Sequence, residues 1–306
     1  MRAPRAIARL LRLTQLFRRA ARRYDSSFLA VARRAVHLHR DLGFRLDEAV
    51  PHGLLDPRLP ESELAAYTSR KVLRPLQARL NPTELSSLTE DKALFYRLCE
   101  ELGIPRPTLY ALFYREATGW ARDGSVLASR EEWYAFLGDA LPADFVVKPS
   151  RGHFGLGVSI LRRRPGGFVD SSGHALSTAD LYARMCSHPQ FDSWVLQERL
   201  RSHPELVRLS GTHAVQTARI ITFIDRSGDW RIAWAHLRVI VGDSVVDNFH
   251  EGKTGNVAAA VSLADDALST AVRASATELG RTVLAAHPGS GVRFAEVGLP
   301  FWAEAR

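Results

Sequence analysis

The sequence predicts an α+β protein with a helical N-terminal region, and three observations support this class. The chain has 306 residues, of which 46% are apolar and 24% charged, a globular composition long enough for about two domains. Apolar residues recur at helical spacing near the N-terminus. Further along, helix-capping residues alternate with short apolar runs bounded by proline or glycine, which is typical of alternating helices and strands.

The positive charge is concentrated at the N-terminus. Residues 1–40 contain eleven arginines and a single acidic residue, Asp25, a net charge of +10 against +8 for the whole chain. The remainder is therefore close to neutral. A nucleic-acid-binding protein is expected to carry its basic patch on a folded face, so nucleic acid is not an expected partner.

The basic segment from Ala3 to about Arg40 is predicted to form one or two helices, because apolar residues follow helical spacing and arginines fill the other face. The members of the apolar stripe are Ile7, Leu10, Leu11, Thr14 and Phe17. Three interpretations remain open: an organelle-type transit peptide, a surface helix attracted to anionic lipid, and a helix packed on the main domain. A peripheral membrane contact through residues 1–40 is thus one alternative.

Cysteine usage and hydropathy limit the cellular setting. Cys99 and Cys186 cannot build a disulfide framework, and neither belongs to a CxxC or Cys/His cluster with zinc spacing. This indicates a reducing compartment, and a cytoplasmic location is expected. No run of 18 apolar residues is present, so a membrane-spanning helix is not expected.

Proline and glycine set the predicted boundaries. Residues 51–60 (PHGLLDPRLP) read as a loop, and Asn81-Pro82 marks a second break. We therefore expect a basic helical region over residues 1–80 and a main domain over 81–306, with a central lobe at about 105–190 and a C-terminal lobe at about 191–306.

Two helices are expected early in the main domain. Thr89 can cap the first, which carries acidic residues in its first turn and ends at Gly103. Its predicted buried stripe is Leu94, Leu98 and Leu102. Ser129 and Glu132 form a capping box that opens the second helix, and a short apolar strand, Phe145–Val147, follows.

The segment FVVKPSRGHFGLGVSIL, residues 145–161, carries the main chemical signal. Lys148 precedes the glycines and a second strand follows them, so neither a Walker loop nor a dinucleotide fingerprint fits. The order is strand, flexible loop, strand. Glycines allow a loop to fold over a polyphosphate with its N–H groups facing the anion, and Lys148 supplies a positive charge beside it. The loop glycines are Gly152, Gly155 and Gly157. An ordinary hairpin turn is the alternative.

A second segment strengthens the nucleotide interpretation. WVLQERL, residues 194–200, is an apolar strand ending in Gln197 and Glu198, where backbone groups can read an adenine edge. Glu205 could accept hydrogen bonds from ribose hydroxyls, or it is simply a first-turn acid of a helix that begins at Pro204.

Two arginines lie in predicted strands further on. Arg219 in residues 214–224 and Arg238 in IAWAHLRVIVG stand among apolar neighbours, where a guanidinium is costly unless it is paired. They could converge on one phosphate or carboxylate, unless the first strand is an exposed edge. His236 and His250 are candidates for proton transfer, but a lone histidine is more often structural.

Six segments in order resemble the ATP-grasp superfamily, and within it the sugar-transfer associated ATP-grasp proteins. The resemblance covers residues 40 to 306. The segments are LNPTELSSLTEDKALF, FVVKPSRGHFGLGV, VLQERL, HAVQTARIITF, VVDNFHEGKTG and HPGSGVRFAEVGLPFW.

The resemblance implies an ATP-grasp fold, two α+β lobes that hold ATP between them, and roles for matching residues. Lys92 and Lys148 would contact phosphates, the Gly152–Gly157 loop would form the lid, Gln197, Glu198 and Leu200 would bind adenine, and Glu205 the ribose. Arg219 and Arg238 would hold the γ-phosphate or acyl phosphate. Asn248, with Asp247 and Gly252, would lie near the acceptor.

The implied reaction is ATP-dependent phosphorylation of a carboxylate, followed by attack of an amine or similar nucleophile on the acyl phosphate. ATP and Mg²⁺ are the implied cofactors, small-molecule carboxylates and amines the substrates, and tailoring of a polysaccharide or secondary metabolite a possible setting. Catalysis would rest on positioning and charge neutralisation.

The metal site departs from the family pattern. Family members bind magnesium through a late acidic residue and a Glu-x-Asn motif, and no such motif follows residue 256. Glu296 in AEVG is not a predicted ligand, because Gly298 stands in the asparagine position. The metal-binding strands are therefore expected to be missing and the metal ligands unknown. A nucleotide-binding regulator or scaffold without ligase activity is the alternative function.

Overall fold

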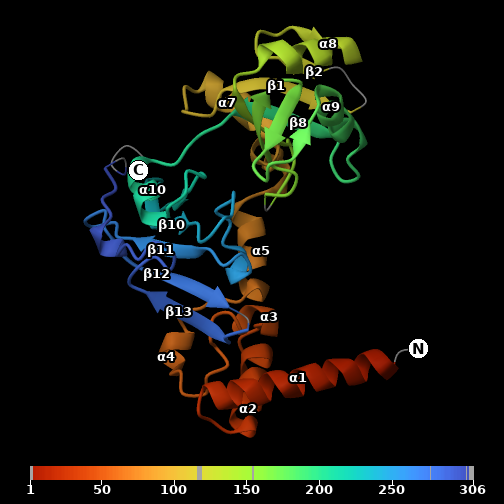
Figure 1. Ribbon diagram of the computed structural model, residues 1–306. Helices are drawn as coiled ribbons and strands as arrows, with labels where there is room; N and C mark the ends of the chain where they lie inside the picture. Colours follow the sequence, from red (N-terminus) through yellow and green to blue (C-terminus); the bar gives the residue numbers. More distant parts are fainter. Residues whose placement is uncertain (1–2, 116–118, 154, 276, 301, 303–306) are drawn as a thin grey trace. The chain divides into compact units, whose positions relative to one another are not determined.

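The computed structural model describes residues 3–115, 119–153, 155–275, 277–300 and 302, and the chain divides into two compact units (Figure 1). One unit is formed by residues 81–201. The other combines Met1–Leu80 with Ser202–Arg306. Each contains helices and an antiparallel sheet, so the predicted α+β class is confirmed.

Residues 81–201 fold around an eight-stranded sheet with the order β3-β2-β1-β8-β4-β5-β6-β7. Its strands are β1 (Leu109–Tyr114), β2 (Gly119–Ala121), β3 (Val126–Leu127), β4 (Asp144–Pro149), β5 (Ser159–Arg164), β6 (Gly167–Asp170), β7 (Ala175–Leu176) and β8 (Ser193–Glu198). Its helical elements are η1 (Thr83–Leu85), α6 (Ser87–Glu90), α7 (Lys92–Glu101), α8 (Arg130–Ala135), the π-helical turn η2 (Phe136–Ala140) and α9 (Thr178–Ser187). The strand–loop–strand order predicted for residues 145–161 is present as the antiparallel pair β4–β5.

Helices cover both faces of this sheet because its central strands alternate between two apolar surfaces. Phe113 of β1 packs with Trp133 of α8 and Leu181 of α9 in the larger core. The next residue along the strand, Leu112, faces the other way and packs with Ala93 of α7. Helix α7 therefore lies on the sheet face opposite α8 and α9.

The start and the buried face of α7 differ from the prediction. Asp91, not Thr89, is the N-cap, and its carboxylate accepts from the backbone N–H groups of Ala93 and Leu94. The predicted stripe was wrong: Leu94, Leu98 and Leu102 are 46%, 37% and 63% exposed, whereas Ala93, Tyr96 and Cys99 are buried. The helix buries the face of Tyr96 and not the leucine stripe, because the Tyr96 hydroxyl makes polar contacts with Gln197 and Lys148 that a leucine cannot make.

The other unit contains a five-stranded antiparallel sheet with the order β13-β12-β11-β10-β9. Its strands are β9 (Ala218–Ile224), β10 (Trp230–Val239), β11 (Val257–Val261), β12 (Leu268–Ser275) and β13 (Gly280–Leu284). The short helical elements of this region are α10 (Pro204–Ser210), η3 (His250–Gly252) and η4 (Phe294–Glu296). One sheet face is buried: Leu237 and Val257 pack with Leu209 of α10, Phe294 and Trp302.

The N-terminal helices belong to this same unit. They are α1 (Ala3–Arg23), α2 (Phe28–Arg40), α3 (Leu46–Ala49), α4 (Glu61–Leu64) and α5 (Arg70–Leu80). Ala20 of α1 and Tyr24, directly after the helix, pack against Val31 and Leu38 of α2, and the cluster includes Leu279 in the turn between β12 and β13. The Tyr24 hydroxyl donates a hydrogen bond to the Leu279 carbonyl. Among the described helices, none is long and apolar enough to cross a bilayer.

Candidate functional site

Strand β4 places Lys148 on the sheet face covered by α7. Phe145 and Val147 point into the larger core, so the alternation of the strand directs Lys148 to the opposite face. Its ammonium group donates to the Tyr96 hydroxyl at 2.9 Å, and that hydroxyl donates to Gln197 Oε1 at 2.8 Å. Three elements, α7, β4 and β8, therefore meet in one polar chain.

Lys92 holds the start of the glycine loop. Its ammonium group donates to the carbonyls of Ser150, at 3.2 Å, and Gly152, at 2.9 Å. Asp91 binds the same segment through hydrogen bonds from Ser150 Oγ at 2.5 Å and Arg151 Nε at 3.0 Å. The N-terminus of α7 and the loop after β4 are thus fixed to each other by side chains of both.

The two lysines are poorly compensated. Burial, and then the charge of Lys92, lowers the pKa of Lys148 to about 8. Burial also lowers the pKa of Lys92, partly offset by Asp91. Burial raises the pKa of Asp91, but hydrogen bonds from Ser150 and Arg151 bring it below the usual value. Among the described side chains, no carboxylate forms an ion pair with Lys148. The site is electrostatically suited to an anion that enters from solvent.

Two glycines of the loop have conformations that require glycine. Gly155 and Gly157 have φ values of +77° and +73°, in the left-handed region that other residues seldom adopt. A Cβ on Gly157 would also lie 2.8 Å from Pro149 Cγ. Gly152 differs: its carbonyl accepts from Lys92. Gly152 therefore lies against Lys92, and Gly155 and Gly157 have turn conformations further along the loop.

Hydrogen bonds and ion pairs hold the end of β8 in place. The Glu198 carboxylate accepts from the backbone N–H of Thr108 at 3.0 Å, which lowers the pKa of Glu198. Arg199 and Arg201 both bind Asp144, at 3.2 and 2.6 Å. Leu200 lies between them, 44% exposed, and within the described chain its backbone groups form no hydrogen bond. They are free to pair with a ligand edge.

Glu205 lies in the first turn of α10, after Pro204, where it pairs with Arg208 at 2.8 Å. This is the helix-terminus role that the sequence left open beside ribose binding. Glu205 belongs to the unit that contains residues 202–306. The other predicted nucleotide-binding residues Lys92, Lys148, Gln197 and Glu198 belong to the unit of residues 81–201.

Arg219 and Arg238 lie on one face of the β9–β10 pair. β9 is a mostly exposed edge strand of its sheet, the alternative that the sequence left open. His236 pairs directly with Arg219 in the strand register, and both arginines, after burial, lower the pKa of His236. The ring of Trp234 stacks on His236, with centroids 5.0 Å apart and planes 20° apart. The opposite strand neighbours on β11 are Ala258 and Ala260, so this face is open beside the cationic groups.

Arg238 is held in place and Arg219 is not. Arg238 Nη2 donates to Thr217 Oγ1 at 2.7 Å, and its Nε lies 3.6 Å from Asp247 Oδ2. The same Asp247 oxygen accepts from the backbone N–H of Thr217 at 2.8 Å. Arg219 is exposed and forms no ion pair with the described residues. Arg219 is therefore the more available guanidinium for a bound anion.

The loop of residues 247–256 is ordered by Asn256, which is fully buried. Its amide nitrogen donates to the carbonyls of Val246, at 3.0 Å, and Asn248, at 3.1 Å, while its oxygen accepts from Val241 N–H. Gly252, with φ of +82°, packs against Ala274, whose carbonyl oxygen would lie 1.8 Å from an added Cβ. The Asn248 carbonyl is thus fixed, directly after Asp247, whose carboxylate lies 3.6 Å from Arg238 Nε.

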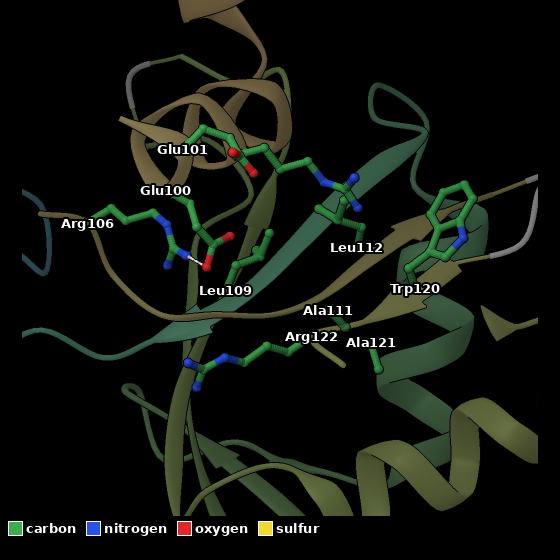
Figure 2. Close-up of a pocket in the computed structure, with 10 residues that line it drawn as sticks. Glu100, Glu101, Arg106, Leu109, Ala111, Leu112, Trp120, Ala121 and Arg122 are labelled. Atoms are coloured by element: carbon green, nitrogen blue, oxygen red, sulfur yellow. Dashed lines mark ion pairs between the residues drawn. The ribbon is translucent and has the colours of Figure 1, made fainter. Parts of the chain in front are cut away.

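A separate cavity of about 270 Å³ lies between α7, β1 and β2 (Figure 2). Arg97, Arg106 and Arg122 line it, together with Trp120, and Arg106 forms an ion pair with Glu100. None of the predicted site residues lines this cavity. It is therefore distinct from the lysine site.

Sequence reasoning missed Tyr96, Ser150 and Asn256. Tyr96 and Gln197 are 101 positions apart in the sequence, so no local sequence pattern predicts their contact. A signal did exist for Asn256, because the loop 247–256 is rich in polar residues and ends at it. Its buried position, however, depends on strands β10 and β11.

A sheet flanked by helices carries two partly buried lysines, of which Lys148 has no carboxylate partner among the described residues and Lys92 binds the start of the glycine loop. These features define a protein suited to bind a phosphate-bearing ligand. The family model described as sugar-transfer associated ATP-grasp matches residues 72–305. The chain therefore belongs to the sugar-transfer associated ATP-grasp family.

A search of solved structures gives D-alanine–D-alanine ligase from Bacillus anthracis, with 14% identity, a TM-score of 0.26, and coverage of 72% of this chain and 63% of the ligase. The chain thus spans less than two thirds of that ligase. No protein of curated function matches this chain in sequence.

ATP-grasp enzymes typically use Mg²⁺, but the described side chains do not offer a ligand set for it. They include no group of three or more His, Cys, Asp or Glu residues suited to a metal ion. Asp247 is engaged by Thr217 and Arg238. Glu296, which lies in η4, is 62% exposed and faces Arg293.

Proposed function

We propose that the protein is an ATP-dependent carboxylate ligase that binds the nucleotide phosphates at Lys92 and Lys148. The observation that carries this proposal is the pair of lysines, both desolvated, beside a glycine turn and without a carboxylate partner for Lys148. Polyphosphate would supply the missing negative charge. The free backbone groups of Leu200 suit an adenine edge.

The proposed reaction has two steps. A substrate carboxylate oxygen attacks the γ-phosphorus of ATP, the bond to the β-phosphate oxygen breaks, and ADP leaves. An amine then attacks the acyl carbon, inorganic phosphate leaves with the bonding electrons, and the amine nitrogen loses a proton. Neither step requires a protein nucleophile. Lys92, Lys148, Arg219 and Arg238 would contribute by binding and neutralising charge as it shifts.

The substrates would be a small-molecule carboxylate and, as the acceptor of its acyl group, an amine or similar nucleophile. Arg219 supports this, because it is an exposed guanidinium beside an open sheet face, and Arg238 and Asn248 are pinned nearby in the same unit. The family description, which names an association with sugar transfer, supports tailoring of a polysaccharide. A cytoplasmic location is part of the same proposal.

ADP formation tests this proposal. The wild type, incubated with ATP, magnesium chloride and a panel of carboxylic acids with amines, should release ADP only when an acid is present. Lys148→Ala should lose this release. Lys71→Ala, which removes an exposed lysine of α5, should retain it. Equal release by Lys148→Ala would contradict the assignment of Lys148.

A non-catalytic nucleotide-binding regulator or scaffold is the second candidate. It is favoured by one observation: the described residues contain no side-chain cluster that could hold a metal ion. This candidate predicts ATP binding that depends on Lys148 without acid-dependent ADP release by the wild type. Measuring ATP binding and ADP release on the same preparation separates the two functions.

We also propose that residues 1–40 make a peripheral contact with a membrane surface. The support is their net charge of +10 together with apolar side chains that α1 leaves exposed to solvent. Basic amphipathic helices lie in the interface of anionic bilayers in this way.

A further inference from the structure

Helix α1 has an anchored half and an unpacked half. From Leu16 onward it packs on α2: Ala20 is fully buried and Tyr24 is 8% exposed. The N-terminal part of the helix extends beyond α2 (Figure 1), and Ile7, Leu10 and Leu11 are 60%, 65% and 58% exposed. The anchored half therefore holds an apolar segment out in solvent.

The exposed apolar side chains form a continuous strip. Ile7, Leu10 and Leu11 follow the i, i+3, i+4 spacing that places side chains on one helical face. Phe17 lies further along that face, and its ring meets Phe28 edge to face with centroids 6.0 Å apart. Phe28 is itself 43% exposed. The strip thus runs from the first turns of α1 to the start of α2.

Arginines border this strip. Arg18 and Arg22 are seven and eleven residues after Leu11, which places them on the same side of the helix, and both are exposed. Arg12, Arg19, Arg23, Arg33 and Arg40 are exposed as well. Arg34 is the exception, because it is 8% exposed and pairs with Glu61 at 2.8 Å. Arg19 also donates a hydrogen bond to the Thr277 carbonyl, and the other described arginines of this region are available to an external anion or to water.

We propose that the strip inserts into an anionic bilayer, with the arginines of α1 binding phosphate-bearing lipid headgroups. This rests on the proposed peripheral contact of residues 1–40 and names its lipid class, its depth and its residues. Two features favour a bilayer over water: apolar side chains on one side, and a charge of +10 with Asp25 as the only acid. Long arginine side chains can keep their charge at headgroup level while their stems lie along apolar surface.

Vesicle flotation of the full chain tests the proposal. The wild type should float with phosphatidylcholine vesicles containing phosphatidylglycerol and not with phosphatidylcholine alone, and high salt should weaken the binding because it screens headgroup charge. Two variants separate the contributions. They are Ile7→Asn/Leu10→Asn/Leu11→Asn and Arg18→Gln/Arg22→Gln. Each should lower the bound fraction about tenfold.

Matched controls carry the same substitutions at other exposed helical positions. They are Leu94→Asn/Leu98→Asn/Leu102→Asn on α7 and its C-cap, and Arg74→Gln/Arg79→Gln on α5. Both should float like the wild type, and circular dichroism should show that every variant is folded. Binding by the Ile7 triple variant equal to that of the wild type would overturn the proposal. So would equal binding to neutral vesicles.

A second copy of the chain is the competing occupant of the strip. Light scattering without vesicles would then show a dimer that the Ile7 triple variant dissociates, and that outcome also overturns the lipid proposal. The nucleotide proposal is tested separately: Lys148→Ala should float like the wild type, and the Ile7 triple variant should retain ATP-dependent thermal stabilisation. Failure of one proposal is thus distinguishable from failure of the other.

Discussion

Lys148 is placed where a lysine destabilises the free protein, because its charge is desolvated and lies near a second ammonium group. Such positions are kept for a ligand rather than for stability. A bound polyphosphate would restore the ordinary preference of the lysine for its charged form.

The lowered pKa of Lys148 predicts how the stability of the protein changes with pH. The pKa of Lys148 is about 8 in the folded protein, against 10.5 for an ordinary lysine. Between these two pH values the unfolded state binds the proton more strongly than the folded state, so the free energy of unfolding should rise with pH across that window. Lys148→Met should therefore be more stable than the wild type at pH 7, by about 1–3 kcal/mol. The advantage should shrink towards pH 10. Urea unfolding without nucleotide measures it. Lys71→Met should change stability little, and a destabilised Lys148→Met would contradict the argument.

Tyr96 connects Lys148 to Gln197, and its own pKa, raised by burial to about 12, keeps it a neutral donor. Tyr96→Phe should cost about 1–2 kcal/mol, because it leaves the oxygen of buried Gln197 without this donor. The same urea experiment measures the loss. Tyr134→Phe, on α8, is the control and should be close to neutral. If the two variants lose equal stability, the polar chain contributes nothing.

At the scale of the element, the Asp91 carboxylate links the N-terminus of α7 to the glycine loop. Asp91→Ala removes the N-cap together with both loop contacts, whereas Ser129→Ala removes a capping box on α8 alone. We expect a loss of about 2–3 kcal/mol for the first and about 1 kcal/mol for the second. Only Asp91→Ala should also weaken ATP binding, as measured by titration calorimetry. Unchanged ATP affinity would show that the loop does not need α7.

The loop of residues 247–256 offers a matched pair of glycines. Gly252 and Gly255 have φ values of +82° and +79°, but only at Gly252 would a Cβ collide with backbone. Gly255→Ala should cost about 1 kcal/mol of backbone strain, and Gly252→Ala clearly more, about 3 kcal/mol or above. Thermal unfolding compares them. Similar losses would mean that the packing of the loop on β12 is unimportant.

The elements differ in how far the sequence could predict them. The capping box at Ser129, the β4–β5 pair and the two N-terminal helices follow from local signals, and the structure contains them. The buried face of α7 does not follow from local signals. Its exposed leucines at i, i+4 and i+8 form a more apolar stripe than the face that is buried. The other face is buried because Tyr96 contacts a strand that is distant in the sequence.

For the candidate site, the sequence could identify residue types and order but not partners. Lys148 and the glycines stand out by their order along the chain, and Arg238 by its apolar neighbours. The lowered pKa of Lys148 and the pinning of Arg238 by Thr217 arise only when separate segments pack together. The ribose role of Glu205 stays a prediction, since its carboxylate pairs with Arg208.

At the scale of the whole molecule, family membership over residues 72–305 and one lysine site support the proposed nucleotide binding. The most direct measurement is thermal unfolding of the wild type and Lys148→Ala, each with and without ATP and magnesium chloride. ATP at about 100 times its Kd should add about 2.7 kcal/mol to the stability of the wild type, raising its Tm, and should leave Lys148→Ala unchanged. An equal rise in both proteins, or no rise in the wild type, would contradict a nucleotide site at Lys148.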